Sequence, residues 1–190
     1  MLRKIVFLDR DGVINTYPGD GEYILRKEEL EIFPFVRESL IKLKERGFLI
    51  YIISNQACVS KGLISPQELI GLTSYMLTLI EKEKPLVDGV YYCIHKEEEN
   101  CPFRKPSPGL IKEVLRKLNM EEAGLDNYPL FFIGDSLRDV KSAKALNIKS
   151  ILILSGKERL ENKENWDIQP DYIFANLKEA VDFIVENVNP

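Results

Sequence analysis

Two acidic residues follow the first apolar segment of the chain at a spacing suited to catalysis or ligand binding. Residues 5–8 are apolar and rich in branched and aromatic side chains, which is typical of a buried strand. Asp9 and Asp11 come directly after it, and Gly12 allows a sharp turn beside them. Carboxylates at the end of a strand in a parallel sheet lie where open α/β proteins bind ligands. Asp9 and Asp11 are therefore candidate catalytic residues, although Asp and Gly also favour ordinary turns.

Three later apolar segments also end in polar clusters. These clusters are Ser54 and Asn55, residues 95–105 ending in Arg104 and Lys105, and Asp135 with Asp139. Taken singly, each could be a helix cap, a turn or a solvated pair of cations. Because parallel strands finish at the same edge of a sheet, we expect all four clusters to meet in one crevice.

The residue types in these clusters suit a magnesium ion and a phosphate group. Asp9, Asp11 and Asp135 would supply hard oxygen ligands of the kind that Mg²⁺ prefers. The phosphoryl oxygens would be bound by neutral donors from Ser54 and Asn55, the point charge of Lys105 and the planar fork of Arg104.

The elements that must position these residues alternate between strand and helix. Apolar runs predict strands over residues 5–8, 48–53, 89–94, 130–133, 148–154 and 172–174. Helical spacing and start signals predict helices over residues 34–46, 65–84, 107–118, 139–146 and 177–188. Residues 17–27 read as a loop or short hairpin over the first strand end. The pattern predicts an α/β fold with a doubly wound, mostly parallel sheet in a single domain over residues 1–190.

Composition limits the classes of partner. The chain has 190 residues, of which 45% are hydrophobic and 29% charged, with a formal net charge of -4. This balance disfavours nonspecific binding to nucleic acid or anionic membranes. No segment resembles an export signal or a membrane span. We expect a cytoplasmic protein, a monomer, with its three cysteines reduced.

Four segments together resemble a known family. Residues 9–15, 54–56, 104–109 and 134–139 resemble the four motifs of the haloacid dehalogenase superfamily. Within it they are most similar to the D-glycero-D-manno-heptose 1,7-bisphosphate phosphatases and the related histidinol-phosphatases. The resemblance covers nearly the whole chain and implies a Rossmann-like core with little or no cap domain.

The resemblance also implies a mechanism. Asp9 would be the nucleophile that forms an aspartyl-phosphate, and Asp11 the general acid and base, protonated at first by the negative charge around it. Mg²⁺ would be held by Asp9, the main-chain carbonyl of Asp11 and Asp135. Lys105 would offset charge on the transferring group, and Asp139 would orient its neighbours rather than bind the metal.

A cysteine and histidine loop over residues 93–105 resembles the zinc loop of the same phosphatases. Cys93, His95 and Cys101 match three of its ligands, whereas Phe103 occupies the fourth position. Structural zinc sites have four protein ligands, so one alternative is a zinc site completed by water or a nearby glutamate. The other alternative is a metal-free loop with reduced thiols.

The sequence is compatible with several substrates. The long segment over residues 17–27 and Arg104 suit a sugar with a second phosphate, which favours the heptose bisphosphate. Histidinol phosphate or another small phosphomonoester would use the same machinery. A polynucleotide end is disfavoured by the acidic balance. A non-catalytic phosphoacceptor or phosphate-binding module is the alternative from another class, but no glycine-rich phosphate loop follows a strand.

Overall fold

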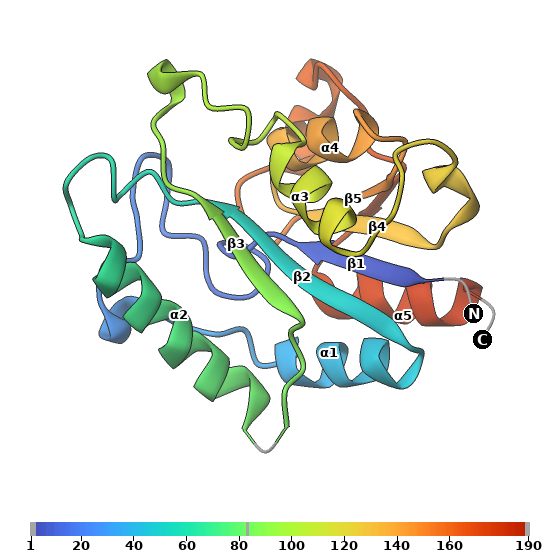
Figure 1. Cartoon of the computed structure of the whole chain (residues 1–190), viewed down its shortest axis with the longest axis horizontal. Helices are drawn as coiled ribbons and strands as arrows, with labels where there is room; N and C mark the ends of the chain where they lie inside the picture. The colour runs from blue at the N-terminus through green and yellow to red at the C-terminus, as the bar shows by residue number, and fades with distance from the viewer. Residues whose placement is uncertain (1–2, 83, 189–190) are drawn as a thin grey trace.

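Six parallel strands form a single sheet at the centre of the chain (Figure 1). The computed structural model describes residues 3–82 and 84–188. The strands are β1 (Lys4–Leu8), β2 (Phe48–Asn55), β3 (Gly89–Cys93), β4 (Leu130–Gly134), β5 (Lys149–Ile153) and β6 (Tyr172–Phe174). Their spatial order is β3-β2-β1-β4-β5-β6. Every predicted strand is confirmed, and so is the doubly wound α/β class.

Helices cover both faces of this sheet (Figure 1). They are α1 (Val36–Glu45), α2 (Pro66–Glu81), α3 (Gly109–Lys117), α4 (Leu137–Lys144) and α5 (Leu177–Asn187). Alternate side chains of β1 enter two different cores: Val6 and Leu8 pack with α1, α2 and α5, whereas Ile5 and Phe7 pack with α3. Since successive strand residues point to opposite faces, an unbroken apolar strand is what a sheet covered on both sides requires.

The strand order reverses direction at β1, which places the first strand at the centre of the site. The connections through α1 and α2 build the sheet outward on one side of β1, and β4 pairs with its other side. Leu8 is in register with both Ile52 and Ile133. The backbone N–H of Asp9 donates to the Ile133 carbonyl at 3.0 Å. Asp9 therefore lies at a topological switch point, beside the ends of β2 and β4.

Three helices begin two residues away from the predicted position. The helix predicted from residue 34 begins at Val36, with Phe35 as its N-cap residue. The helix predicted from Ser107 begins at Gly109 with Pro108 as its N-cap residue, and the turn before it is closed by the Ser107 N–H, which donates to the Arg104 carbonyl at 2.9 Å. The helix predicted from Asp139 begins at Leu137 with Ser136 as its N-cap residue, and Asp139 occupies the third helical position of a capping box. Residues 17–26 form a loop rather than a hairpin, followed by a short 3₁₀ turn at Lys27–Glu29.

Within residues 3–82 and 84–188, no helix combines the length and the apolar character that crossing a bilayer would need.

The two-sided core generates a stability prediction. Ile184 of α5 is completely buried, and truncating it to alanine leaves a cavity that the packed neighbours cannot fill. We expect Ile184→Ala to lower the free energy of unfolding by about 2–5 kcal/mol. The matched control is Ile70→Ala in α2, where the side chain is 63% exposed, and this change should have little effect. Urea denaturation followed by circular dichroism measures both variants, and equal losses would contradict the assignment of the core.

Candidate active site

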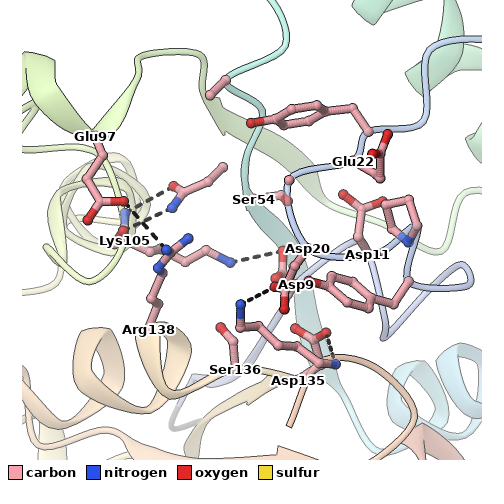
Figure 2. Close-up of a pocket in the computed structure, with 18 of the residues that line it drawn as sticks. Asp9, Asp11, Asp20, Glu22, Ser54, Glu97, Lys105, Asp135, Ser136 and Arg138 are labelled. Atoms are coloured by element: carbon pink, nitrogen blue, oxygen red, sulfur yellow. Dashed lines mark hydrogen bonds and ion pairs between the residues drawn. The ribbon is translucent and has the colours of Figure 1, made fainter.

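The predicted polar clusters meet in one pocket at the carboxyl edge of the sheet (Figure 2). The pocket has a volume of about 330 Å³. Seven of the predicted site residues line it: Asp9, Asp11, Ser54, Asn55, Arg104, Lys105 and Asp135. Asp139, the eighth, is buried directly behind them. The expected convergence of four strand ends is therefore what the structure shows.

A buried ammonium group lies at the base of this pocket. The Nζ atom of Lys105 is 2.9 Å from Oδ1 of Asp9 and 2.6 Å from Oδ1 of Asp139. It also donates to the main-chain carbonyl of Ile53, at the end of β2, at 3.0 Å. Lys105 is only 4% exposed, and the carboxylates of Asp9 and Asp139 together compensate its buried charge. In Figure 2 its side chain reaches Asp9 from one side of the pocket, and Asp11 lies on the other.

Burial and neighbouring charges shift the pKa values of this group. Burial raises the pKa of Asp9 to about 6, although the positive charge of Lys105 acts in the opposite direction. Burial also raises the pKa of Asp135, and the nearby carboxylates of Asp9 and Asp139 add to the rise. Burial alone would lower the pKa of Lys105, but Asp139 and Asp9 outweigh it and raise that pKa above its usual value. The site thus concentrates negative charge that favours a cation.

Three carboxylates could hold a metal ion. One oxygen of each of Asp9, Asp135 and Asp139 lies within 4.8 Å of the others. The Asp139 carboxylate is already occupied, because Oδ1 pairs with Lys105 and Oδ2 accepts from the Ser136 hydroxyl at 2.7 Å and the Ser136 N–H at 3.1 Å. This occupancy supports the expectation that Asp139 orients its neighbours rather than binding the metal.

The oxygens expected to bind magnesium are left open. Within the described parts of the chain, no hydrogen bond or ion pair is made by Oδ2 of Asp9, by Oδ1 of Asp135 or by the main-chain carbonyl of Asp11. Hard oxygen donors close together, two of them from carboxylates, fit the preferences of Mg²⁺. The residues present therefore suit the ion that the sequence predicts.

Glycines hold Asp135 in place from two sides. A Cβ atom at Gly12 or at Gly156 would collide with the Asp135 carboxylate, and Gly12 has a positive φ of 79°. Both positions therefore require glycine, and the loops that carry them pack directly against this side chain. The Lys157 N–H, beside Gly156, donates to Oδ2 of Asp135 at 2.8 Å. Sequence reasoning noted the turn at Gly12 but missed the role of Gly156.

Asp11 does not share the environment of Asp9. Its carboxylate accepts hydrogen bonds from the side chains of Arg10, Asn15 and Gln56. That the negative charge of Asp9 and of a phosphate keeps Asp11 protonated at first stays a prediction, and the structure adds three donor side chains around its carboxylate. These three partners lie inside the quoted motifs, but their types alone gave no indication of this role.

Ser54 and Asn55 differ in what they offer to a ligand. The Asn55 amide holds the backbone of Lys105, donating to its carbonyl at 2.9 Å and accepting from its N–H at 3.0 Å. Asn55 therefore positions the lysine, and one amide hydrogen remains for a phosphoryl oxygen. The Ser54 hydroxyl accepts from the Gln56 amide at 3.1 Å, which leaves its own hydrogen for the pocket.

Charged side chains from three loops and from the start of α4 form the rim of the pocket. Lys157 pairs with Asp20, which also accepts from the Tyr17 hydroxyl at 2.6 Å. Arg138 lies 3.5 Å from Glu97, and Arg104 donates to the main-chain carbonyl of His95 at 2.9 Å. No local sequence pattern indicates the rim roles of Lys157 and Arg138, because their partners are distant in the chain.

The three zinc candidates lie close together in the loop after β3. The ligand atoms of Cys93, His95 and Cys101 are within 4.8 Å of one another, and Cys93 Sγ is 3.8 Å from His95 Nδ1. Phe103, at the position of the fourth ligand, is 44% exposed. The cluster thus has the spacing of a site with three protein ligands, an arrangement that fits both alternatives, a zinc site completed by a further ligand and a metal-free loop with reduced thiols.

Comparison with known proteins identifies the family to which this chain is similar. A family model described as HAD-hydrolase-like matches residues 102–180. The D-glycero-D-manno-heptose-1,7-bisphosphate 7-phosphatase of Chlorobaculum tepidum is 32% identical over 185 residues, which cover 94% of this chain and 92% of that protein. The D-glycero-beta-D-manno-heptose-1,7-bisphosphate 7-phosphatase of Helicobacter pylori strain J99 is 33% identical over 184 residues, covering 95% of this chain and 97% of that protein.

Solved structures share the fold. The D,D-heptose 1,7-bisphosphate phosphatase from B. bronchiseptica, complexed with magnesium and phosphate, superposes with a TM-score of 0.86 at 22% identity, covering 97% of this chain and 99% of that chain. The corresponding phosphatase from Burkholderia thailandensis gives a TM-score of 0.67 at 22% identity, with 96% and 99% covered. The chain belongs to the haloacid dehalogenase-like hydrolases. Within them it belongs to the heptose 1,7-bisphosphate 7-phosphatase family, whose members are phosphoric monoester hydrolases.

Proposed function

We propose that residues 1–190 form one phosphatase domain that removes the 7-phosphate of D-glycero-D-manno-heptose 1,7-bisphosphate with Mg²⁺ as cofactor. The main support for this proposal is the difference between the two oxygens of the Asp9 carboxylate. Its Oδ1 is fixed by the Arg10 N–H at 2.7 Å and by Lys105 at 2.9 Å, while its Oδ2 has no donor among the described residues and lies in the pocket. One oxygen is held and the other is available, as a nucleophile requires.

In the first half-reaction an oxygen of Asp9 forms a bond to phosphorus as the bond from phosphorus to the sugar oxygen breaks. The departing alkoxide takes a proton, and we assign its donation to Asp11, the role that the family resemblance implies. Lys105 offsets negative charge on the phosphoryl oxygens, and the Ser54 hydroxyl donates to them. The product of this step is an aspartyl-phosphate at Asp9.

In the second half-reaction water attacks phosphorus and gives a proton to Asp11. The bond from phosphorus to the Asp9 oxygen breaks, which restores the carboxylate and releases inorganic phosphate. Mg²⁺, bound through Asp9, Asp135 and the Asp11 carbonyl, would neutralise charge on the transferring group. Asp139 keeps Lys105 in position in both steps, because it pairs with the ammonium group without facing the pocket.

The rim of the pocket supports a substrate with a second phosphate. Five cationic side chains line it in addition to Lys105: Lys61, Lys96, Arg104, Arg138 and Lys157. Their charges exceed what one transferring phosphate uses, and Arg104 presents a fork suited to a phosphate. The curated relatives described above act, by their names, on a heptose bisphosphate. Two of these cations, Lys157 and Arg138, already pair with Asp20 and Glu97, so a second phosphate would take them over from these carboxylates, whereas histidinol phosphate has only one phosphate. We place the enzyme in the cytoplasm.

The nucleophile is tested by Asp9→Asn, which keeps the shape of the side chain but removes the charge. We expect phosphate release from the heptose bisphosphate to fall on the order of 10⁴-fold or more. The control is Asp167→Asn, an exposed carboxyl that pairs only with Lys141 outside the pocket, and this variant should keep normal activity. A folded Asp9→Asn protein with normal turnover would refute the assignment.

The same substitution has an expected effect on stability. Because the folded protein holds the pKa of Asp9 at about 6, it binds a proton more readily than the unfolded chain does between about pH 4 and pH 6. The Asp9 contribution therefore makes the metal-free protein less stable as pH rises through this window. The Asp9→Asn variant has no charge at this position, so it does not lose stability as pH rises through this window. At pH 7 its free energy of unfolding should exceed that of the metal-free wild type by on the order of 1–3 kcal/mol. Thermal unfolding in EDTA at pH 4.5 and pH 7 measures the difference, and a less stable variant at pH 7 would contradict it.

Substrate choice is tested by Mg²⁺-dependent phosphate release from both anomers of the heptose bisphosphate, the heptose 7-monophosphate and histidinol phosphate. We expect kcat/KM for one bisphosphate anomer to exceed that for the monophosphate by about 10- to 100-fold, the effect of one charged hydrogen-bonded contact. Equal or faster turnover of histidinol phosphate would assign the enzyme to that substrate instead. No turnover of any compound would favour a binding module.

A further inference from the structure

We propose that the Asp20 carboxylate occupies the binding position of the substrate's second phosphate in the free enzyme and is displaced when a bisphosphate binds. Asp20 is then a specificity-determining residue, because a substrate with one phosphate has no group that exchanges with it. The inference rests on the proposed function, and it names the side chain with which the second phosphate competes.

The Asp20 carboxylate lies among groups that suit a phosphate. Its Oδ1 accepts from the Lys157 ammonium group and, at 2.6 Å, from the Tyr17 hydroxyl. Both contacts lower the pKa of Asp20, and the positive charge of Arg138 acts in the same direction. All four residues line the pocket, and Figure 2 labels Asp20 and Arg138. Since ammonium, guanidinium and hydroxyl donors also bind phosphate oxygens, Asp20 is an internal anion at a position suited to a phosphate.

Lys157 is held in place at its backbone. Its N–H donates to Oδ2 of Asp135 at 2.8 Å, while its Nζ reaches Asp20 on the loop over residues 17–26. Lys105 serves the transferring phosphate at the base of the pocket, so Lys157 on the rim is left for the second one. Because the lysine is fixed to the proposed metal-binding edge, the carboxylate is the partner that leaves.

Asp20 lies on a segment with little packing around it. Gly19 and Gly21 flank it, with positive φ values of 116° and 81°. A Cβ atom at Gly21 would meet nothing within 4 Å, and one at Gly19 would meet only the Glu22 side chain. Glycine at such positions lets the backbone change direction without a steric penalty. The segment can therefore carry Asp20 away from Lys157 without disturbing the core.

The relative strengths of the two anions favour the exchange. The Asp20 side chain is 75% exposed and that of Lys157 is 36% exposed. An ion pair this accessible to water contributes little free energy, because solvent screens it. A phosphate monoester carries a charge of about -1.5 to -2 and three acceptor oxygens, which is more than a carboxylate offers. A second phosphate therefore competes successfully for Lys157, whereas a neutral sugar hydroxyl does not.

A double-mutant cycle at Asp20 and Lys157 tests this competition. Asp20→Asn removes the competing charge, and we expect the KM for the heptose bisphosphate to fall about 2- to 5-fold, the range of one exposed ion pair. Lys157→Met removes the cation, and the KM should rise about 10-fold. In the Lys157→Met background, Asp20→Asn should change the KM by less than about 2-fold, because the contested cation is gone.

Two comparisons make the cycle specific. The ratio of the KM for the heptose 7-monophosphate to that for the bisphosphate should rise about 2- to 5-fold in Asp20→Asn and fall about 10-fold in Lys157→Met. Glu22→Gln is the matched control, since it removes one negative charge from the same loop at the same pocket. This variant should keep the wild-type KM for the bisphosphate.

Every other outcome counts against the inference. An unchanged or higher bisphosphate KM in folded Asp20→Asn protein would show that Asp20 does not compete with the substrate. Equal changes for monophosphate and bisphosphate, or the same change in Glu22→Gln, would show a general effect of the loop. A full effect of Asp20→Asn in the Lys157→Met background would show that Lys157 is not the contested group. Failure of the wild-type enzyme to release phosphate from the bisphosphate would instead refute the proposed function.

Discussion

The whole site depends on one buried ammonium group that two carboxylates share. Lys105 lies between Asp9 and Asp139 with almost no access to solvent, and a buried cation is tolerated only when it is paired. Its two partners follow β1 and β4, and the backbone pairing of these strands brings the two carboxylates together. Asn55 holds the end of the loop over residues 95–105, since it binds the Lys105 backbone on both its donor and its acceptor. The proposed nucleophile, the cation and the proposed metal-binding edge are thus parts of one electrostatic arrangement.

The sheet makes this arrangement possible because it brings distant segments to one edge. Asp9 and Asp135 follow neighbouring strands, and Leu8 and Ile133 are in register just before them. Gly12 and Gly156 let two loops close on Asp135 where any larger residue would collide. The two acids of the first motif then acquire different environments only two residues apart. Asp9 keeps one free oxygen in the pocket, whereas Asp11 is surrounded by donors.

Much of the fold and the inner part of the site could be predicted from the sequence, and the reasons are physical. Buried parallel strands appear in a sequence as clear apolar runs, and the polar residues that follow them must lie at the same edge of the sheet. For these reasons Asp9, Ser54, Lys105 and Asp135 could be identified without coordinates. The direction in which a side chain points could not be predicted from the sequence. Asn55 was expected to face the phosphate but mainly holds the lysine, and the donors around Asp11 depend on the rotamers of buried residues. The rim partners Lys157 and Arg138 depend on the paths of loops, which no local pattern specifies.

The most direct test of the central claim is to identify the atom that receives the phosphoryl group. Enzyme quenched in acid during turnover of the bisphosphate can be reduced with borohydride, which converts a phosphorylated aspartate into homoserine, and then mapped by peptide mass spectrometry. The account predicts homoserine at residue 9, dependent on both substrate and Mg²⁺. Modification at Asp11 or Asp135, or an unmodified enzyme that still turns over, would contradict it.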